Sequence, residues 1–209
     1  MIIQPAGRLA DTKEYYFSLK LKEISKMNQQ GIDVVNLGIG NPDLPPSEAT
    51  INALIKSAQN PRNHGYQSYV GIKEFRQAFA DKYKSLYGVD LNVDTEILPL
   101  LGSKEAIMHI ALTFLDHGDE VLVPNPGYPT YTSATRIAGA VVRHYDLLEK
   151  NSYYPDFEKM DKEDYSKVKL MFLNYPNMPT GAPATDEVFK KAIAFAQKHK
   201  VLIVHDNPY

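Results

Sequence analysis

The sequence lacks cysteine, an excess of charge of either sign and any long apolar run. Without cysteine it cannot form a disulfide framework. Its 23 basic and 25 acidic side chains give a net charge of -2, so no basic field is available to hold nucleic acid, which is not an expected partner. The longest apolar stretches, such as 168–173, are far shorter than the roughly 20 residues that span a bilayer. No membrane segment is therefore expected.

The N-terminus lacks the basic start and apolar run of a signal peptide, so the expected location is the cytoplasm. The 44% hydrophobic content of the 209 residues is typical of a globular protein with a sizeable core. After residue 46, short β-type runs alternate with longer helical patterns, which predicts an α/β fold with a mostly parallel sheet. The expected strands are 96–101, 120–123, 140–145, 168–173 and 201–205, and the expected helices are 103–115, 128–138 and 185–200.

Two of these expected helices carry apolar stripes that predict their buried faces. The predicted inward residues are Ile107, Ile110, Ala111 and Phe114 in the first, and Val188, Phe189, Ala192, Ile193 and Ala196 in the second. The charged stretch 149–167 is interpreted as a solvated helix or connection.

The first 46 residues follow a different pattern. Residues 31–46 join a β-branched run to a Gly- and Pro-rich turn, which predicts a strand entering a tight, exposed loop. The residues before it resemble an arm with one amphipathic helix, because Tyr16, Leu19, Ile24 and Met27 recur at helical spacing.

Parallel sheets bind ligands at the carboxyl ends of their strands, so the residues that follow each expected strand are the candidate site. Gly102, Ser103 and Lys104 follow strand 96–101 and open a helix whose free N–H groups and positive dipole end suit a phosphate. An ordinary helix start with an exposed lysine is the alternative. Tyr128 follows strand 120–123 in a proline-stiffened loop, where its ring either meets a planar ligand or packs the turn.

Two further candidate segments follow the later strands. The loop 174–181 is rich in amide donors. Asp206 and Tyr209 follow the last strand, where a carboxylate can pair with a protonated ring nitrogen and a phenol can reach an adjacent ring oxygen. His205 is expected on the other face of the strand as a packed residue. The six histidines show no ligand spacing with a carboxylate, so no metal is expected.

These loops, in their order and spacing, resemble the fold-type I pyridoxal-phosphate enzymes, and specifically the class I/II aminotransferases of the aspartate aminotransferase superfamily. The resembling segments are 37–43, Tyr66 with Gly71 and residues 75–76, 102–105, 126–129, 179–181 and 206–209. The resemblance implies the cofactor pyridoxal 5'-phosphate. It also implies a partial large domain of the fold-type I α/β/α architecture, with residues 1–45 as the N-terminal arm or small-domain segment and 46–209 as an incomplete large domain. The C-terminal small domain would be absent.

The resemblance further implies a role for each matching residue. Gly102, Ser103 and Lys104 would cradle the cofactor phosphate, Tyr128 would stack on the pyridine ring, Asp206 would hold the ring nitrogen protonated, and Tyr209 would bond the ring hydroxyl. Gly40 would lie beside the substrate carboxylate. Tyr66 would reach the phosphate of the neighbouring subunit, which implies a homodimer.

One position departs from the family pattern. The family has asparagine directly before Pro-Thr-Gly, where it bonds the ring hydroxyl, and this sequence has Met178, whose thioether cannot donate that bond. Asn177 or Asn174 could replace it, or the hydroxyl could be left to Tyr209.

The resemblance implies an enzyme that transfers an amino group between an amino acid and a 2-oxo acid. The lysine that forms the family's Schiff base lies beyond the Asp-x-x-Tyr segment, and no position here matches it, so we expect a fragment that is inactive alone. Other fold-type I chemistry, as in a C–S lyase or decarboxylase, stays open, as does a non-catalytic pyridoxal-phosphate- or ligand-binding module. A dinucleotide-binding domain is disfavoured because Pro42 interrupts the glycine fingerprint.

Overall fold

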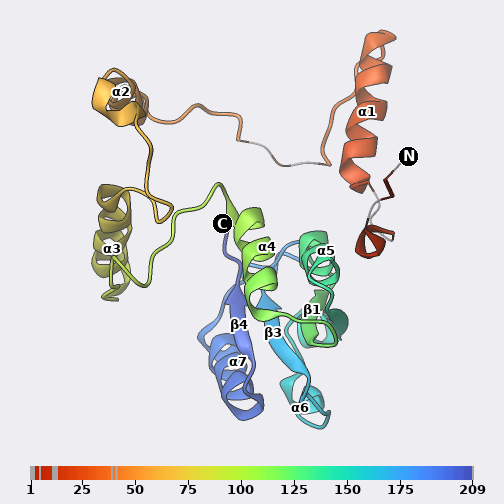
Figure 1. Ribbon diagram of the computed structural model, residues 1–209. Helices are drawn as coiled ribbons and strands as arrows, with labels where there is room; N and C mark the ends of the chain where they lie inside the picture. Colours follow the sequence, from red (N-terminus) through yellow and green to blue (C-terminus); the bar gives the residue numbers. More distant parts are fainter. Residues whose placement is uncertain (1–2, 5, 11–13, 39, 41, 209) are drawn as a thin grey trace. The chain divides into compact units, whose positions relative to one another are not determined.

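The computed structural model describes residues 3–4, 6–10, 14–38, 40 and 42–208. The chain divides into two compact units (Figure 1). The sheet unit consists of Met1–Thr12 and Leu100–Tyr209, and the helical unit is Lys13–Pro99. The boundary expected from the sequence, at residue 45, separates the arm from the large domain of the resembled family, and it stays a prediction.

The sheet unit contains four parallel strands in the order β2-β1-β3-β4 (Figure 1). They are β1 (Glu120–Asn125), β2 (Val141–Asp146), β3 (Val168–Leu173) and β4 (Leu202–His205). The register of β1 against β3 shifts once, between Glu120 and Val121. The expected α/β fold with a parallel sheet is confirmed.

The three helices expected in this unit are also confirmed, with ends within two residues of the prediction. Its helical elements are η1 (Gly7–Leu9), α4 (Ser103–Phe114), α5 (Pro129–Ile137), η3 (Glu149–Asn151), α6 (Phe157–Met160) and α7 (Asp186–His199). Thr185 caps α7 by accepting a hydrogen bond from the backbone N–H of Val188 at 3.2 Å, which satisfies one of the helix's unpaired N–H groups.

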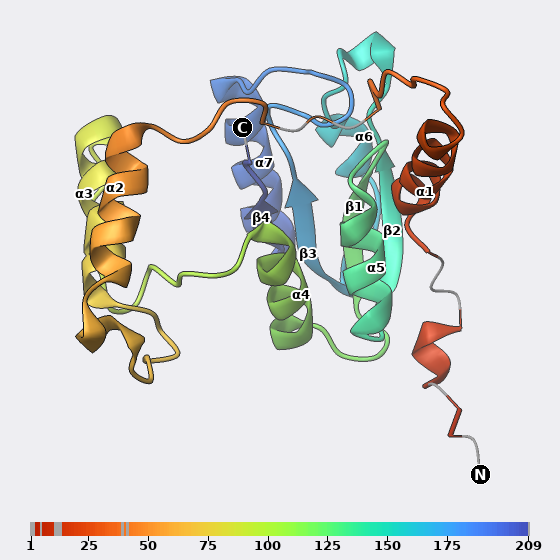
Figure 2. The ribbon, with the colours of Figure 1, turned by 90° about the horizontal axis from the view of Figure 1, so that it is seen from above.

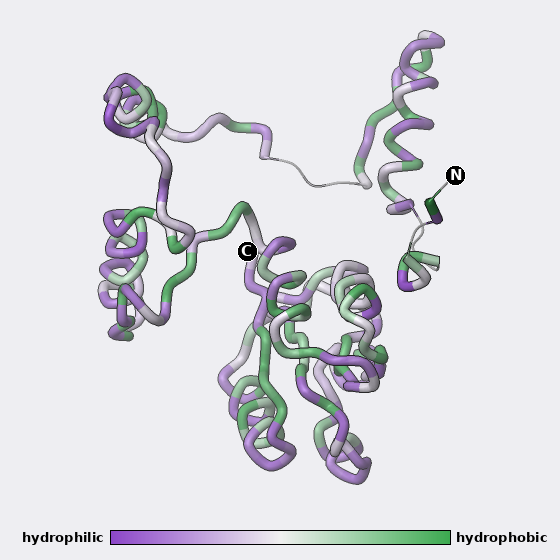
Figure 3. Tube along the Cα trace, in the orientation of Figure 1, coloured by the Kyte–Doolittle hydropathy of each residue, from purple (hydrophilic) through white to green (hydrophobic). Residues whose placement is uncertain are grey.

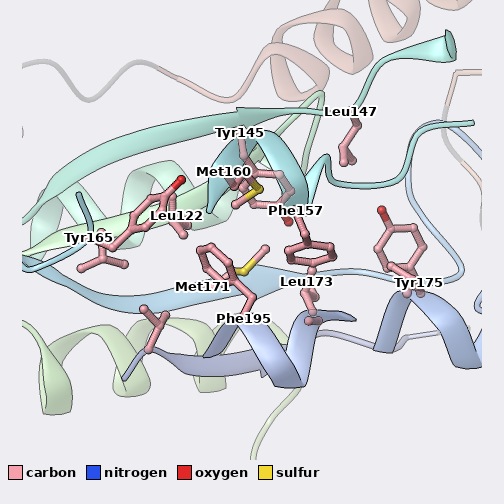
Figure 4. Close-up of a cluster of buried hydrophobic side chains, with 14 of the residues drawn as sticks. Leu122, Tyr145, Leu147, Phe157, Met160, Tyr165, Met171, Leu173, Tyr175 and Phe195 are labelled. Carbon is pink, nitrogen blue, oxygen red and sulfur yellow. The ribbon is translucent and has the colours of Figure 1, made fainter. Parts of the chain in front are cut away.

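Successive side chains of a strand point to opposite faces, so β1 and β3 supply two hydrophobic clusters. Val121, Val123, Leu170 and Phe172 pack with α4 and α5, and Leu122, Met171 and Leu173 pack with α6 and α7. Figure 2 shows the strands between these two pairs of helices. Figure 4 shows the second cluster, in which the side chains of Met171 and Leu173 lie among those contributed by the helices. Burial on both faces explains why β1 and β3 are almost continuously apolar.

Two expected strands are wrong. Residues 97–100 and 32–37 have no regular secondary structure. An apolar, β-branched run becomes a strand only when its backbone groups pair with a neighbour. Within the described residues, neither segment joins the four-stranded sheet.

The predicted burial needs three corrections, two of them on the buried faces of helices. In α7, Ile193 is 52% exposed and Phe195 is buried, because successive residues are 100° apart around a helix and Phe195 lies nearer the direction of Val188 and Ala192. In α4, Ile107 and Ala111 are buried and Ile110 is half-buried as expected, but Phe114 is 51% exposed. The chain becomes extended at Leu115, which takes the inward position after the helix ends.

The third correction concerns 149–167, which is more than a solvated connection. Phe157 and Met160 from α6, together with Tyr165, are buried in the cluster that lies against α7. Their apolar side chains alternate with charged ones, which hid the core contribution in the sequence. The guanidinium of Arg143 packs over the Tyr165 ring with 4.4 Å to its centroid and forms ion pairs with Glu120 and Glu163.

The helical unit contains α1 (Tyr16–Gln29), α2 (Glu48–Ala58), η2 (Pro61–His64) and α3 (Lys73–Tyr87). The helix expected around Tyr16–Met27 is confirmed as α1. Within the described part of this unit only Arg76 and Ala80 are buried, although Figure 3 shows hydrophobic residues recurring along its helices. Arg76 pairs with Asp94 at 3.0 Å, and its buried Nε has no hydrogen-bond partner among the described residues.

Candidate functional site

The order of the strands marks one end of the sheet as the place where a ligand is expected. From β1 the chain goes to β2 on one side, and from β3 it goes to β4 on the other. The connections that leave β1 and β3 therefore run in opposite directions, and the carboxyl ends of these strands border the crevice in which open α/β sheets bind ligands. Residues 126–128, 174–181 and 206 follow β1, β3 and β4 at this end.

Asp206 is held at this edge by three hydrogen bonds. Its N–H donates to the carbonyl oxygen of Leu173 at 2.8 Å, and its own carbonyl oxygen accepts from Nδ2 of Asn174 at 2.8 Å. Its side-chain oxygen Oδ2 accepts from the hydroxyl of Tyr131 at 2.7 Å. Both the backbone and the carboxylate of Asp206 are thus fixed relative to the end of β3.

Tyr131 connects Asp206 with two other predicted site residues. Its ring is fully buried and stacks on Phe172 with 4.7 Å between centroids and 10° between planes. The Tyr128 ring meets it edge to face, with centroids 5.6 Å apart, and Nζ of Lys104 lies 5.9 Å from the centroid of Tyr128. The structure therefore brings Lys104, Tyr128 and Asp206 together. The sequence interpretation did not single out Tyr131, and its position three residues after Tyr128, on the same face of α5, is the signal that could have found it.

The start of α4 provides a surface for an anion. Gly102 is the N-cap, with φ +106°, a conformation that glycine adopts without strain. Gly102 has no side chain, so the N-cap position itself offers no side-chain acceptor to the first-turn N–H groups of α4. The Glu105 carboxylate instead bonds back to the N–H of Leu101 at 2.7 Å, and Ser103 is exposed at the first helical position. An anion with oxygen acceptors suits this helix end.

The loop that carries Tyr128 has little freedom. A Cβ on Gly127 would lie 2.4 Å from the carbonyl oxygen of Pro124, so no larger residue fits without movement. Asn125 donates from Nδ2 to Asp146 at 3.0 Å, which ties the end of β1 to the end of β2. α5 then begins at Pro129, whose fixed φ and missing N–H suit the first turn of a helix.

The loop after β3 is held by its own amides. The buried side chain of Asn177 accepts from the hydroxyl of Thr180 at 2.6 Å and donates to the carbonyl oxygen of Asn174 at 3.1 Å. Oδ1 of Asn174 accepts from the N–H of Met178 at 2.7 Å. Both asparagines thus shape the loop, and the bond from Asn177 to a ring hydroxyl stays a prediction.

Four other residues were named from the sequence: His205, Tyr209, Gly40 and Tyr66. His205 packs its ring edge-on against Phe189, with 5.0 Å between centroids, and hydrogen-bonds the backbone of Tyr175, as expected for a packed histidine. Tyr209 lies outside the described residues. Gly40 and Tyr66 belong to the helical unit, where both are exposed, Tyr66 to 95%. The roles of Tyr209, Gly40 and Tyr66 stay predictions.

Burial and hydrogen bonding shift the pKa of several groups in the sheet unit, some buried and some exposed. Burial raises the pKa of Tyr165 to about 12 and that of Tyr175 further above its ordinary value. Hydrogen bonds from Lys198 and His199 lower the pKa of Asp161. Within the described ranges, no three His, Asp or Glu side chains gather as metal ligands, and no helix is long and apolar enough to cross a membrane.

Comparison with known families shows to which family the chain belongs. The family model described as aminotransferase class I and II matches residues 32–209. The chain belongs to this aminotransferase family. Its enzymes depend on pyridoxal phosphate, so the family and the cofactor predicted from the sequence are confirmed.

Similar proteins support the same family. The LL-diaminopimelate aminotransferases of Oleidesulfovibrio alaskensis and Aquifex aeolicus are 44% and 41% identical to the chain over 98% of its length. The solved structure of apo-BacF from Bacillus subtilis is 42% identical with a TM-score of 0.92, covering 99% of this chain and 52% of that one. Thermus thermophilus aspartate aminotransferase with maleate is 28% identical with a TM-score of 0.92, covering 100% and 54%. The chain spans about half the length of the curated relatives, 53% for both enzymes named here.

Proposed function

We propose that the complete protein is a pyridoxal-phosphate-dependent aminotransferase that transfers an amino group between an amino acid and a 2-oxo acid. The observation that carries this proposal is the connected set of Lys104, Tyr128, Tyr131 and Asp206 at the carboxyl end of one parallel sheet. Beside it lies a helix start without a side-chain cap. The set offers a positive end, an aromatic face and a carboxylate, which match the phosphate, the ring and the ring nitrogen of the cofactor.

The phosphate would bind at the start of α4. Gly102 lets the backbone turn with positive φ, the first-turn N–H groups and the hydroxyl of Ser103 are donors, and the ammonium of Lys104 balances negative charge. Lys104 also lies near the Tyr128 ring, which supports placing phosphate and ring next to each other.

The ring would bind between Tyr128 and Asp206. When bound, pyridoxal phosphate supplies an electron sink for the electron pair left on the substrate when its α-proton is lost. The carboxylate of Asp206 would hold a proton on the ring nitrogen. Tyr128, fixed by its stiff loop and by Tyr131, would pack against the ring face and exclude water from it.

Other residues complete the proposed site from the family resemblance. Tyr209 would bond the ring hydroxyl, and Asn177 is the second candidate for that bond. Gly40 would lie next to the substrate carboxylate, and Tyr66 would reach the phosphate held by a neighbouring subunit, so the protein would act as a homodimer. We expect it in the cytoplasm. No residue of the chain is assigned as the catalytic lysine.

The relatives' names suggest a substrate. Eight curated relatives at 40–45% identity are named LL-diaminopimelate aminotransferase, so LL-diaminopimelate is our first candidate amino donor. Because one fold can carry several reactions, a C–S lyase or decarboxylase reaction and a non-catalytic binding module are tested as alternatives.

The test follows a labelled amino group. The complete protein, loaded with pyridoxal phosphate, is given 15N-labelled LL-diaminopimelate and a 2-oxo acid. We expect the label in a new amino acid, with the rate lowered roughly 100-fold in Asp206→Asn. Asp186→Asn is the matched control, because Asp186 is an exposed carboxylate in the first turn of α7, and its rate should equal that of the wild type.

Each alternative gives a different result in this assay. Release of carbon dioxide or of a thiol from suitable amino acids, without transfer of the label, would indicate a decarboxylase or lyase. Cofactor binding without turnover of any amino acid would indicate a binding module. Failure to bind pyridoxal phosphate would refute the proposal.

A further inference from the structure

We propose that Tyr131 is the positioning residue for Asp206. By donating its hydroxyl to Oδ2, it holds the carboxylate so that Oδ1 is the oxygen left to pair with the ring nitrogen of the cofactor. This inference rests on the proposed function and adds a residue that lies outside the segments carrying the family resemblance.

The geometry of Asp206 supports a fixed orientation. The 2.7 Å bond from Tyr131 occupies Oδ2, whereas Oδ1 accepts no hydrogen bond from any described residue. The backbone of Asp206 is bonded on both sides, to Leu173 and to Asn174. The carboxylate can therefore turn only about its side-chain bonds, and the bond to Tyr131 is what stops that rotation. Oδ1 is left for a second partner, which can be a charged one.

Tyr131 itself is held rigidly. Its ring is fully buried, lies parallel to Phe172 at 4.7 Å and meets Tyr128 edge to face. A hydroxyl on such a ring cannot follow a moving carboxylate, so the carboxylate is held by the hydroxyl. The same ring contacts Tyr128 and bonds Asp206, which links the aromatic surface and the charged group that we assign to the cofactor ring.

The chain contains a matched control for this hydroxyl. Tyr145 is also a buried tyrosine in the sheet unit, and its hydroxyl donates to the carbonyl oxygen of Phe172 at 2.6 Å. It belongs to the cluster on the opposite face of the sheet, and its described hydrogen bond goes to the backbone of Phe172 and not to Asp206. Tyr145→Phe removes a buried hydroxyl and a hydrogen bond without touching Asp206.

The experiment measures binding of pyridoxamine phosphate to the complete protein by calorimetry. The proteins compared are wild type, Tyr131→Phe, Tyr145→Phe, Asp206→Asn and the double variant of Tyr131 and Asp206. We expect Tyr131→Phe to weaken binding about tenfold, since it removes a hydrogen bond to a charged group, and Tyr145→Phe to weaken it less than about twofold. If Tyr131 acts through Asp206, the double variant will bind like Asp206→Asn alone.

A second readout reports on the ring nitrogen without using activity. In the 15N spectrum of pyridoxamine phosphate labelled at that nitrogen, we expect the protonated signal for the wild type and Tyr145→Phe. Asp206→Asn should give the unprotonated signal, and Tyr131→Phe should lie between the two. A purely structural loss at Tyr131 would lower stability without moving this signal.

A third measurement needs no change at Tyr131 and remains available if Tyr131→Phe does not fold. The hydroxyl proton of Tyr131 should give a downfield NMR signal in the protein without cofactor. It should move upfield in Asp206→Asn, because a neutral amide oxygen is a weaker acceptor than a carboxylate. A signal that does not respond to Asp206→Asn would overturn the inference.

The outcomes separate this inference from the proposed function. If the wild type does not bind pyridoxamine phosphate, the proposed function fails and the inference fails with it. If the wild type binds and Tyr131→Phe binds equally well, only the inference is overturned. It is also overturned if Tyr145→Phe loses as much affinity, or if the losses at Tyr131 and Asp206 add in full.

Discussion

The sheet unit and the helical unit differ in how they use their apolar residues. β1 and β3 bury side chains on both faces, against α4 and α5 on one and α6 and α7 on the other. In the described part of the helical unit only Arg76 and Ala80 are buried, and large side chains such as Phe79, Leu54 and Tyr83 are exposed.

This difference shows that a sequence can specify helices by local signals without specifying a buried core. Ser47 caps α2 by accepting from the N–H of Thr50, and Gly88 ends α3, so local signals define these helices. Such signals contribute little compared with burial of an amphipathic face. The stability of the chain should therefore reside in the sheet unit.

Hydrogen exchange on the whole chain gives the largest expected contrast. The opening that allows amides of β3 to exchange should cost nearly as much free energy as global unfolding, typically about 5–15 kcal/mol. Amides of α3 should open at a cost of only a few kcal/mol at most, because few buried contacts hold them. Equal protection of β3 and α3 would contradict the comparison.

Removing one ring from each unit gives the next largest contrast. Phe172→Ala should lower the free energy of unfolding by about 3–5 kcal/mol, because Phe172 is fully buried and stacks on Tyr131. Phe79→Ala, at a side chain 43% exposed on α3, should cost roughly 1 kcal/mol or less. Urea unfolding followed by circular dichroism measures both, and similar midpoint shifts would argue against a core confined to the sheet unit.

Alkaline pH should destabilise the sheet unit. Burial raises the pKa of Tyr165 to about 12, so the folded state favours the neutral phenol. That contribution is complete below the unfolded value of about 10 and is lost as the pH rises from there through about 12. The melting temperature should fall over this range, less steeply in Tyr165→Phe than in the wild type. Parallel curves for the two proteins would show that Tyr165 does not contribute.

The smallest contrast compares two helix caps. Thr185→Ala removes the cap of α7 and should lower the global stability by about 1 kcal/mol. Ser47→Ala removes the cap of α2 and should loosen that helix locally while leaving the melting temperature of the sheet unit unchanged. A global loss from Ser47→Ala as large as that from Thr185→Ala would indicate that the two units unfold together.

The sequence predicts the sheet unit well because its strands are buried on both faces and its helices alternate with them. The parallel sheet, α4, α5 and α7 follow from that alternation. The expected strand at 96–101 was wrong because pairing with a neighbour is a property of the fold that an apolar run does not contain. The exposure of Ile193 likewise depends on the direction in which α7 faces the sheet, which its full set of apolar residues leaves ambiguous.

Two residues of the candidate site, Tyr128 and Asp206, were predictable because they follow strands of the sheet, whereas Lys104 was named after an expected strand that the structure does not contain. Lys104, Tyr128 and Asp206 were named from the sequence, and the structure brings them together. Tyr131 was not named: its spacing of three residues from Tyr128 was overlooked, and its bond to Asp206 joins residues 75 positions apart, which no local pattern predicts. The loop bonds of Asn177 were also hidden, since an amide that can reach a ligand can equally hold its own loop.

The tight approach of Gly127 to Pro124 has a consequence for how this site can change. Pro124 is buried at the end of β1, so it cannot retreat from a side chain added at Gly127. Any such substitution would push the chain outward and carry Tyr128 with it. Pro124 and Gly127 together fix the distance between the end of β1 and the ring of Tyr128. Position 127 is therefore closed to any residue with a side chain as long as Tyr128 keeps its present place.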